Sequence, residues 1–141
     1  MSKFSVIISG WPAVGKTTIA GELASEFGLV TYNGGDILKM LAYDKGYSNA
    51  KSRGDWWDTQ EAKMFMEERK RDPIFDRKVD ERLADILKNE SAVITSYTLP
   101  WLVNDTKVIK FWLKGSPKNR AERMSNRDGI TVQEAEKIVA L

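Results

Sequence analysis

Short apolar segments alternate with amphipathic ones in the first third of the chain. Phe4 to Ile8 is an apolar run rich in β-branched residues, and residues 16–27 repeat apolar side chains at the helical period. Leu29 to Tyr32 is predicted as a second strand, and a helix is expected from about Ile37 to Lys45. This order of strand, helix, strand and helix predicts a parallel sheet that is covered by helices.

The alternation continues after a polar loop that is predicted over residues 46–54. Asp72 and Pro73 then have the residue types of a helix start, with Asp at the N-cap and Pro at the first helical position. The later elements are expected to be helices over 56–71, 74–89 and 117–127, strands over 92–95 and 108–113, and a last helix that opens with a capping box at 131–134. No repeat or linker interrupts the pattern, so residues 1–141 are expected to form one α/β domain with about four strands.

The composition excludes several kinds of chemistry. The chain has no Cys and no His, which removes disulfides, cysteine nucleophiles and imidazole acid–base catalysis. Its apolar runs are strand-sized, whereas a membrane span needs about 20 consecutive apolar residues. The N-terminus lacks the pattern of a signal peptide, so we expect a cytoplasmic protein that does not bind membranes.

Basic residues are concentrated near the C-terminus of a chain whose net charge is only +2. Between residues 103 and 127, seven Lys and Arg residues stand against two acidic residues, a local net charge of +5. A local basic segment suits a small polyanionic ligand better than polymeric nucleic acid, which binds a broad basic face. From charge alone, a solvated basic face explains the same pattern equally well.

One motif has a defined chemistry. Residues 10–17 (GWPAVGKT) match GxxxxGK[ST] and lie between a predicted strand and a predicted helix. In such a loop, backbone amides point inward as an anion nest, and the helix N-terminus adds a positive dipole. Lys16 is expected to reach the β and γ phosphates of ATP, and the Thr17 hydroxyl is expected to bind Mg²⁺. The expected ATP-binding residues are Gly10, Trp11, Pro12, Ala13, Val14, Gly15, Lys16, Thr17 and Thr18.

Two further patterns lie where a ligand is expected. Residues 33–36 (NGGD) follow the second predicted strand, and ligands of open α/β sheets bind at the carboxyl ends of the strands. The same residues also suit a plain turn and helix N-cap. Arg120, Arg123 and Arg127 share one helix face by their spacing, and we expect them to meet phosphate oxygens or paired acids rather than solvent.

With these motifs the chain resembles the P-loop nucleoside monophosphate kinases, and especially the archaeal-type cytidylate kinases. The resemblance covers nearly the whole chain through ISGWPAVGKTTIAGELASEFGL, GGDILKMLA, ERKRDPIFDRKVDERL and FWLKGSPKNRAERMSNRDGITVQEA. The first segment is common to many families, whereas the last two are more specific. The resemblance implies a three-layer P-loop NTPase fold, an acceptor-nucleotide segment over residues 36–72 and a lid over residues 116–137.

The resemblance also implies an activity and roles for individual residues. The activity is transfer of the ATP γ-phosphoryl group to a nucleoside monophosphate, with CMP or dCMP favoured and Mg²⁺ required. The implied catalytic residues are Lys16 and, facing the phosphates, Arg120, Arg123 and Arg127. The implied acceptor residues are Gly35, Asp36 and Lys39, with Asp76, Arg77, Asp80 and Arg82 in the helix that borders the acceptor.

The chain departs from the family pattern at three places. Lys39 and Tyr97 stand where the family has arginines, and family members continue beyond residue 141 with a fifth strand and a terminal helix. Two alternatives therefore stay open, a P-loop kinase for another small hydroxylated metabolite and a catalytically weak nucleotide-binding module. Family members are monomers, but the fourth predicted strand is expected to be a sheet edge. Its exposed Val108, Phe111 and Leu113 would then favour self-association.

Overall fold

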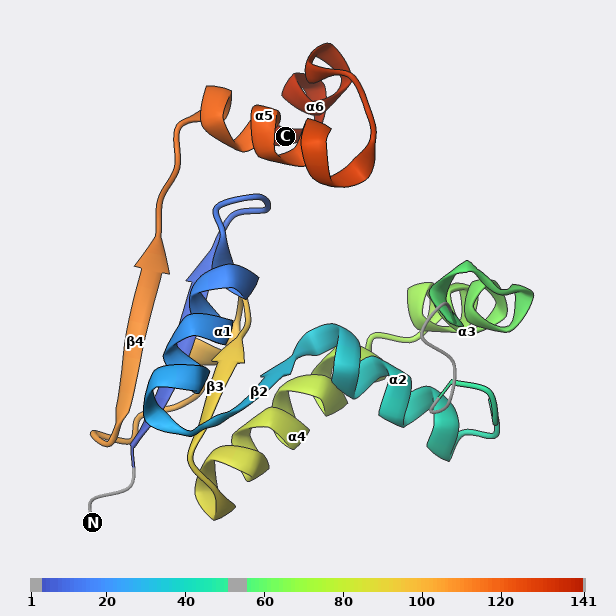
Figure 1. Ribbon diagram of the computed structural model, residues 1–141. Coiled ribbons are helices and arrows are strands. Elements are labelled where there is room, and N and C mark those ends of the chain that lie inside the picture. Colours follow the sequence, from blue (N-terminus) through green and yellow to red (C-terminus); the bar gives the residue numbers. More distant parts are fainter. Residues whose placement is uncertain (1–3, 51–55, 141) are drawn as a thin grey trace.

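The computed structural model describes residues 4–50 and 56–140, and its centre is a four-stranded parallel sheet (Figure 1). The strands lie in the order β2-β3-β1-β4, and each neighbouring pair is parallel. Their bounds are β1 Ser5–Gly10, β2 Val30–Asn33, β3 Ala92–Thr95 and β4 Val108–Leu113. The predicted parallel α/β sheet is confirmed, with β1 and β2 displaced by one or two residues toward the C-terminus.

Besides the strands, the described residues form six α-helices and two short 3₁₀ helices, joined by loops and turns. The α-helices are α1 Lys16–Phe27, α2 Gly34–Asp44, α3 Gln60–Arg71, α4 Ile74–Asn89, α5 Pro117–Asp128 and α6 Val132–Val139, and the 3₁₀ helices are η1 Trp56–Asp58 and η2 Leu99–Trp101. The helix predicted over 56–71 is interrupted, because the Thr59 side chain accepts a hydrogen bond from the Ala62 amide and caps a new helix. Of the predicted loop over 46–54, residues 51–54 lie outside the described residues.

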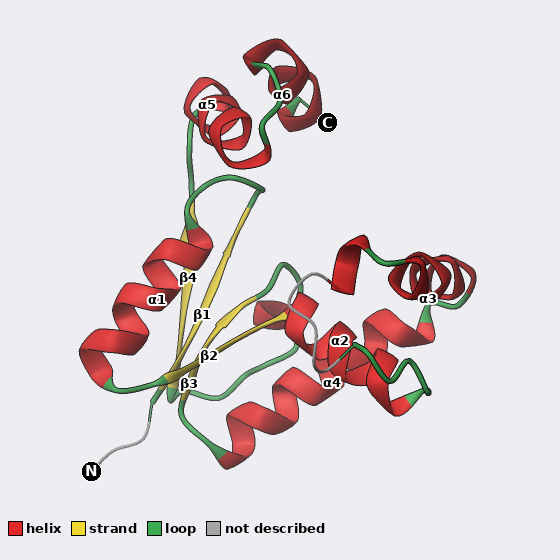
Figure 2. Cartoon of the chain, turned by 45° about the vertical axis from the view of Figure 1, so that its right-hand side comes forward, coloured by secondary structure: helices red, strands yellow, loops and turns green. Residues whose placement is uncertain are grey.

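Helices cover both faces of the sheet, which gives three layers (Figure 2). Along β1, Val6 and Ile8 pack against α1, whereas Ile7 packs with the buried side chains of α2 and α4. This alternation follows from the two-residue period of a strand. Helices α2 and α4 cover one face of the sheet and α1 covers the other. These three helices leave the carboxyl ends of the strands uncovered.

Two further parts of the chain lie beside this core, η1 with α3 and the pair α5 and α6. Trp56 is fully buried and packs against Phe65 of α3, so α3 joins the core cluster on the α2 and α4 side. Helices α5 and α6 form a hairpin above the carboxyl end of β1, with a separate apolar cluster around Ala121, Met124 and Ala135 (Figures 1 and 2). The hairpin corresponds to the segment that the resemblance assigns to a lid.

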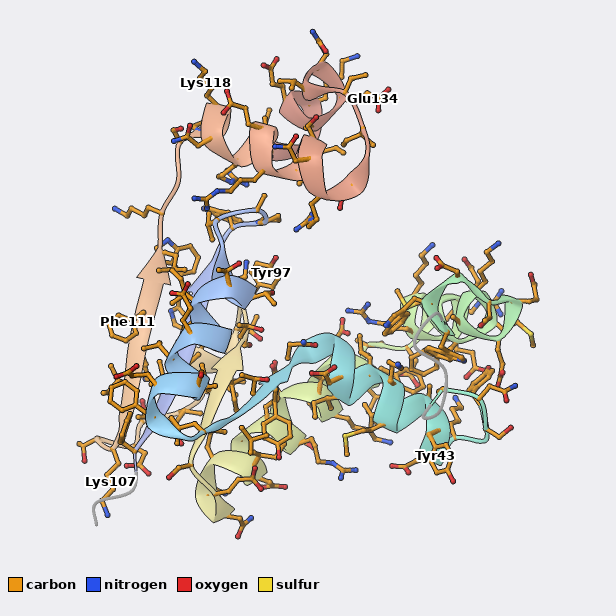
Figure 3. The ribbon with its side chains drawn as sticks, viewed as in Figure 1. Tyr43, Tyr97, Lys107, Phe111, Lys118 and Glu134 are labelled. Carbon is orange, nitrogen blue, oxygen red and sulfur yellow. The ribbon has the colours of Figure 1, made fainter. Side chains whose placement is uncertain are left out.

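Within the described residues, β4 is an edge strand, because it pairs only with β1. Phe111 is 47% exposed and projects from the outer side of the strand (Figure 3). The expected exposure of Val108 and Leu113 is wrong, because both are half-buried. Val108 packs against the cluster of α2 and α4, and Leu113 packs against the cluster of α1. No helix in residues 4–50 and 56–140 is long and apolar enough to span a membrane.

Candidate active site

The loop between β1 and α1 has an unusual backbone. Gly10 and Gly15 have φ angles of 150° and 95°, and Ala13 has a φ of 64°. A Cβ at Gly10 would lie 2.7 Å from the Leu113 carbonyl oxygen, so only glycine fits where β1 and β4 end side by side. A Cβ at Gly15 would lie 3.1 Å from the Nη1 atom of Arg123. The two motif glycines therefore allow close approach of β4 and α5.

Lys16 begins α1 and turns back onto this loop. Its Nζ donates hydrogen bonds to the carbonyl oxygens of Gly10 at 2.7 Å and Trp11 at 3.0 Å. The pKa of Lys16 lies below its usual value, first because burial desolvates the ammonium and then because Arg120 and Arg127 add positive charge nearby. A bound anion would stabilise the charged form of Lys16, so this environment suits an anionic ligand.

A cavity of about 750 Å³ opens over the loop, and we call it the P-loop cavity. Thr17 lines it, which places a hydroxyl beside the anion nest, whereas Trp11 turns away and packs edge-on against Trp112 at 5.9 Å. Its lining comprises Pro12, Ala13, Val14, Gly15, Lys16, Thr17, Thr18, Ile19, Tyr97, Arg123 and Arg127. The structure thus brings together most of the residues predicted to bind ATP, but neither Gly10 nor Trp11 lines this cavity.

The three arginines of α5 differ in what they contact. Arg123 and Arg127 line the P-loop cavity. Arg127 also makes two hydrogen bonds to Asp128, of 2.7 and 3.0 Å, which raise its pKa. Arg120 is only 9% exposed, and its Nε donates to the carbonyl oxygen of Pro12 at 3.0 Å. Helical spacing predicted a shared face for the three, but their contacts separate them.

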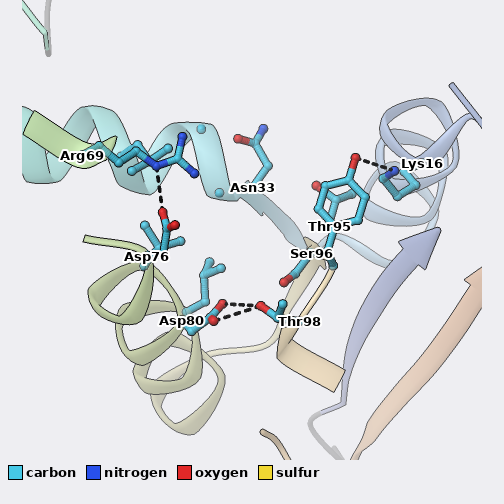
Figure 4. Close-up of a pocket in the computed structure, with 14 residues that line it drawn as sticks. Lys16, Asn33, Arg69, Asp76, Asp80, Thr95, Ser96 and Thr98 are labelled. Atoms are coloured by element: carbon cyan, nitrogen blue, oxygen red, sulfur yellow. Dashed lines mark hydrogen bonds and ion pairs between the residues drawn. The ribbon is translucent and has the colours of Figure 1, made fainter. Parts of the chain in front are cut away.

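A second cavity of about 500 Å³, the α4 cavity, lies at the carboxyl ends of β2 and β3 (Figure 4). Two pairs of polar side chains face it. Arg69 Nε donates to Asp76 at 2.7 Å, and the Thr98 hydroxyl lies 2.9 and 3.0 Å from the two carboxylate oxygens of Asp80. Its full lining is Lys16, Asn33, Gly34, Gly35, Leu38, Arg69, Asp76, Val79, Asp80, Leu83, Thr95, Ser96, Tyr97 and Thr98.

The predicted acceptor residues divide into two groups. Gly35, Asp76 and Asp80 line the α4 cavity, whereas Asp36, Lys39, Arg77 and Arg82 do not. Asp36 accepts a hydrogen bond from the backbone amide of Asn33, and Asn33 in turn accepts one from the Asp36 amide, which forms the capping box of α2. The alternative that this turn is a helix N-cap is therefore observed, with Asn33 as the N-cap and Asp36 at position N3. Arg82 lies 3.5 Å from Asp44, and both residues line a separate surface groove.

Among the contributors to the α4 cavity that sequence reasoning missed are Arg69 and Thr98. Arg69 lies in the basic run of residues 69–71 before Pro73, and nothing in that run distinguishes it from its neighbours. Only the packing of α3 beside α4 directs it to Asp76. Thr98 follows β3, and its position at the carboxyl end of a central strand is a signal that could have identified it.

The Thr17 hydroxyl at the loop is an oxygen donor of the kind that suits Mg²⁺. Among residues 4–50 and 56–140, no group of three or more acidic or metal-binding side chains is placed to hold a metal ion. Mg²⁺ in phosphoryl-transfer sites keeps several waters and is held by phosphate oxygens and few protein groups, so it does not need such a cage. The Thr17 hydroxyl in the P-loop cavity is the group that would hold it.

Comparison with known proteins agrees with this arrangement. Residues 6–140 match the sequence model of a family described as AAA domain. The cytidylate kinase of Pyrococcus horikoshii is 30% identical over 133 residues, which cover 94% of this chain and 62% of the relative. That of Aeropyrum pernix is 32% identical over 129 residues, which cover 92% of this chain and 67% of the relative. The chain thus spans about two thirds of the length of these relatives.

Solved structures show the same fold at low sequence identity. A shikimate kinase from Bacteroides thetaiotaomicron has a TM-score of 0.54 at 14% identity, over 99% of this chain and 76% of that one. A gluconokinase from Sinorhizobium meliloti has a TM-score of 0.54 at 19% identity, over 98% and 73% of the two chains. The family model matches nearly the whole chain, and the P-loop lies between β1 and α1 of a parallel sheet. This chain therefore belongs to the AAA domain family of P-loop kinases, and it is similar to archaeal cytidylate kinases.

Proposed function

We propose that this chain transfers the γ-phosphoryl group of ATP to a nucleoside monophosphate, with CMP or dCMP favoured. The observation that carries the proposal is that the P-loop cavity and the α4 cavity share Lys16 and Tyr97 in their linings. A donor in the first cavity and an acceptor in the second would meet at Lys16. The similarity to cytidylate kinases over more than nine tenths of the chain supports this class of acceptor. We also propose a cytoplasmic location, where both substrates are available.

The residues present suit this reaction without a general base. The attacking atom is an oxygen of the acceptor phosphate, which is already ionised, and the bond from the γ-phosphorus to its bridging oxygen breaks as ADP leaves. Lys16 would exchange its contacts with the Gly10 and Trp11 carbonyls for phosphate oxygens. Arg123 and Arg127 of α5 also line the P-loop cavity and would neutralise the charge of the transferring group. The Thr17 hydroxyl would hold Mg²⁺, which would supply further charge neutralisation.

The α4 cavity offers groups for both ends of a cytidine nucleotide. The Asp80 carboxylate is a hydrogen-bond acceptor for an exocyclic amine, which cytosine has and uracil lacks. Arg69 supplies a guanidinium, and its partner Asp76 holds that group in place through the 2.7 Å contact. On this proposal, the base lies toward α4 and the phosphate lies toward Lys16.

One observation favours a second candidate, a kinase for another small hydroxylated metabolite. Of the described residues that line the α4 cavity, only Lys16 and Arg69 are cationic, and Arg69 is already paired with Asp76. Tyr97 is neutral where the family resemblance has an arginine. A neutral hydroxyl acceptor needs less positive charge than a monophosphate dianion, so this lining suits it as well.

The experiment that separates these candidates measures ADP release with a panel of acceptors and with ATP alone. CMP, dCMP, UMP, AMP, shikimate and gluconate would be tested with the wild-type chain and with Lys16→Ala as the inactive control. Stimulation by CMP or dCMP above all other acceptors supports the proposal, and stimulation by a non-nucleotide supports the second candidate. ADP release that no acceptor stimulates would instead indicate a catalytically weak nucleotide-binding module.

A further inference from the structure

Helix α5 holds the peptide between Pro12 and Ala13 from outside the P-loop cavity. The buried Arg120 donates from Nε to the Pro12 carbonyl oxygen at 3.0 Å, and Arg120 is absent from the lining of that cavity. We propose that Arg120 is a positioning residue, which fixes this peptide so that the Ala13 amide faces the phosphate, and that it is not itself a phosphate ligand. The inference rests on phosphate binding at the P-loop but not on the identity of the acceptor.

The argument begins with the planarity of the peptide group. In a trans peptide, the C=O and N–H groups point in opposite directions, and the described residues contain no cis peptide. Because the Pro12 carbonyl points toward Arg120, the Ala13 N–H must point away from it. Ala13 lines the P-loop cavity and Arg120 does not, and the proposal takes the side away from Arg120 to be the cavity side. One hydrogen bond on the outside therefore orients a donor on the inside.

The backbone of Ala13 explains why such a restraint is needed. With a φ of 64°, Ala13 has the only left-handed backbone of a non-glycine residue in residues 4–50 and 56–140. The left-handed region is unfavourable for a residue with a Cβ, because that atom approaches the following carbonyl oxygen. Without an external contact, the peptide between Pro12 and Ala13 would relax toward a commoner conformation and turn the amide away from the phosphate.

Packing from the same hairpin supports the hydrogen bond. Ala13 packs against the apolar cluster of α5 and α6 that includes Ala121 and Met124. The Arg120 side chain passes closely over Gly115, where an added Cβ would lie 3.2 Å from its Cγ. The tip of the P-loop is thus held by one hydrogen bond and one apolar contact, both from the α5–α6 hairpin. Any displacement of the hairpin would release the Ala13 amide.

The decisive experiment is a double-mutant cycle. The measured quantity is the affinity of each variant for Mg·ADP, determined by calorimetry. Arg120→Met and Arg123→Met are each made in the wild-type chain and in Ala13→Gly, which removes the strain of the left-handed backbone. We expect Arg120→Met to weaken binding about tenfold in the wild-type chain, as for loss of one oriented donor, and less than threefold in Ala13→Gly. Arg123→Met should weaken binding equally in the wild-type chain and in Ala13→Gly, because Arg123 lines the cavity directly.

Equal losses for Arg120→Met in the two backgrounds would overturn the proposal, because they would indicate an effect of charge alone. Arg120→Lys guards against a variant that does not fold. It keeps the charge and most of the stem, but places a methylene where Nε stands. It should therefore lose affinity as Arg120→Met does, and recovery of wild-type affinity by Arg120→Lys would also overturn the proposal.

A ligand-free measurement separates failure of this inference from failure of the proposed function. In the ¹H–¹⁵N spectrum, the amide signal of Ala13 should shift or broaden in Arg120→Lys and Arg120→Met and stay in place in Arg127→Met. An unmoved Ala13 amide overturns the inference even if ADP binds. Conversely, a wild-type chain that binds no ADP would refute the proposed function, while the Ala13 signal would still decide the role of Arg120.

Discussion

The ammonium of Lys16 lies 3.5 Å from the hydroxyl oxygen of Tyr97 and 4.5 Å from the centroid of its ring. An ammonium at this distance from an aromatic ring is attracted by the negative face of the ring. Tyr97 therefore holds Lys16 from the β3 side while the Gly10 and Trp11 carbonyls hold it from the loop. An arginine at position 97 would instead repel Lys16, so the departure from the family pattern changes the resting state of the lysine.

Lys16→Ala should lower phosphoryl transfer by about two to three orders of magnitude, because it removes a preorganised cation from the reacting phosphates. The fold should remain, since Lys16 lies at the junction of the loop and α1 and is only partly buried. Steady-state kinetics and circular dichroism would check both expectations. Lys118→Ala, an exposed lysine of α5, is the control that should leave turnover unchanged.

Tyr97→Arg should tighten the binding of CMP if the acceptor is an anion, since a guanidinium can make two parallel hydrogen bonds to a phosphate. We expect KM for CMP to fall several-fold. Tyr97→Phe keeps the ring and should change KM less than threefold. A KM for CMP that does not respond to Tyr97→Arg would place the acceptor phosphate elsewhere.

Because the pKa of Lys16 is lowered in the folded state, the free energy of unfolding should depend on pH. Between the folded-state pKa and the ordinary value of 10.5, the unfolded state binds more protons than the folded state. The free energy of unfolding therefore rises with pH across that window as far as Lys16 contributes to it. Lys16→Met should be more stable than wild type near about pH 7, and this advantage should shrink toward about pH 10. Chemical denaturation of both chains at several pH values tests this, and an advantage that grows with pH would contradict it.

Asp80→Asn should reduce the preference for CMP over UMP, because an amide can donate to the uracil carbonyl as well as accept from the cytosine amine. The ratio of kcat/KM for the two acceptors should fall about tenfold, within the range for loss of one base-specific contact. Asp85→Asn, on the same helix but outside the α4 cavity, should leave the ratio unchanged. An unchanged ratio in Asp80→Asn would mean that Asp80 does not contact the base.

The edge strand β4 should promote self-association of this chain. Phe111, Ile109 and Trp112 are each more than two fifths exposed, and an unpaired apolar strand edge is a template for intermolecular pairing. Phe111→Lys should lower the apparent mass measured by light scattering at high concentration. Met64→Lys, which changes an exposed apolar side chain on α3, is the control that should have no effect. A wild-type chain that is monomeric at all concentrations would contradict this prediction.

Some features of the chain followed from sequence alone because they depend on local spacing. The alternation of strands and helices predicted the parallel sheet, and the match of residues 10–17 to GxxxxGK[ST] predicted the loop between β1 and α1. The capping pattern of residues 131–134 likewise predicted the start of α6, where the Thr131 side chain accepts a hydrogen bond from the Glu134 amide. These are properties of neighbouring residues along a strand or helix, so no knowledge of the packing was needed.

Tertiary structure alone decided which of these residues meet. Arg120 reaches Pro12 while Arg123 faces the cavity, because α5 starts just beyond the end of β4, beside the loop that follows β1. Arg69 meets Asp76 through the packing of α3 beside α4, and Lys16 meets Tyr97 because β1 and β3 are neighbours in the sheet. Each contact joins segments that the chain separates, and its geometry depends on strand order and helix packing, which local periodicity does not encode.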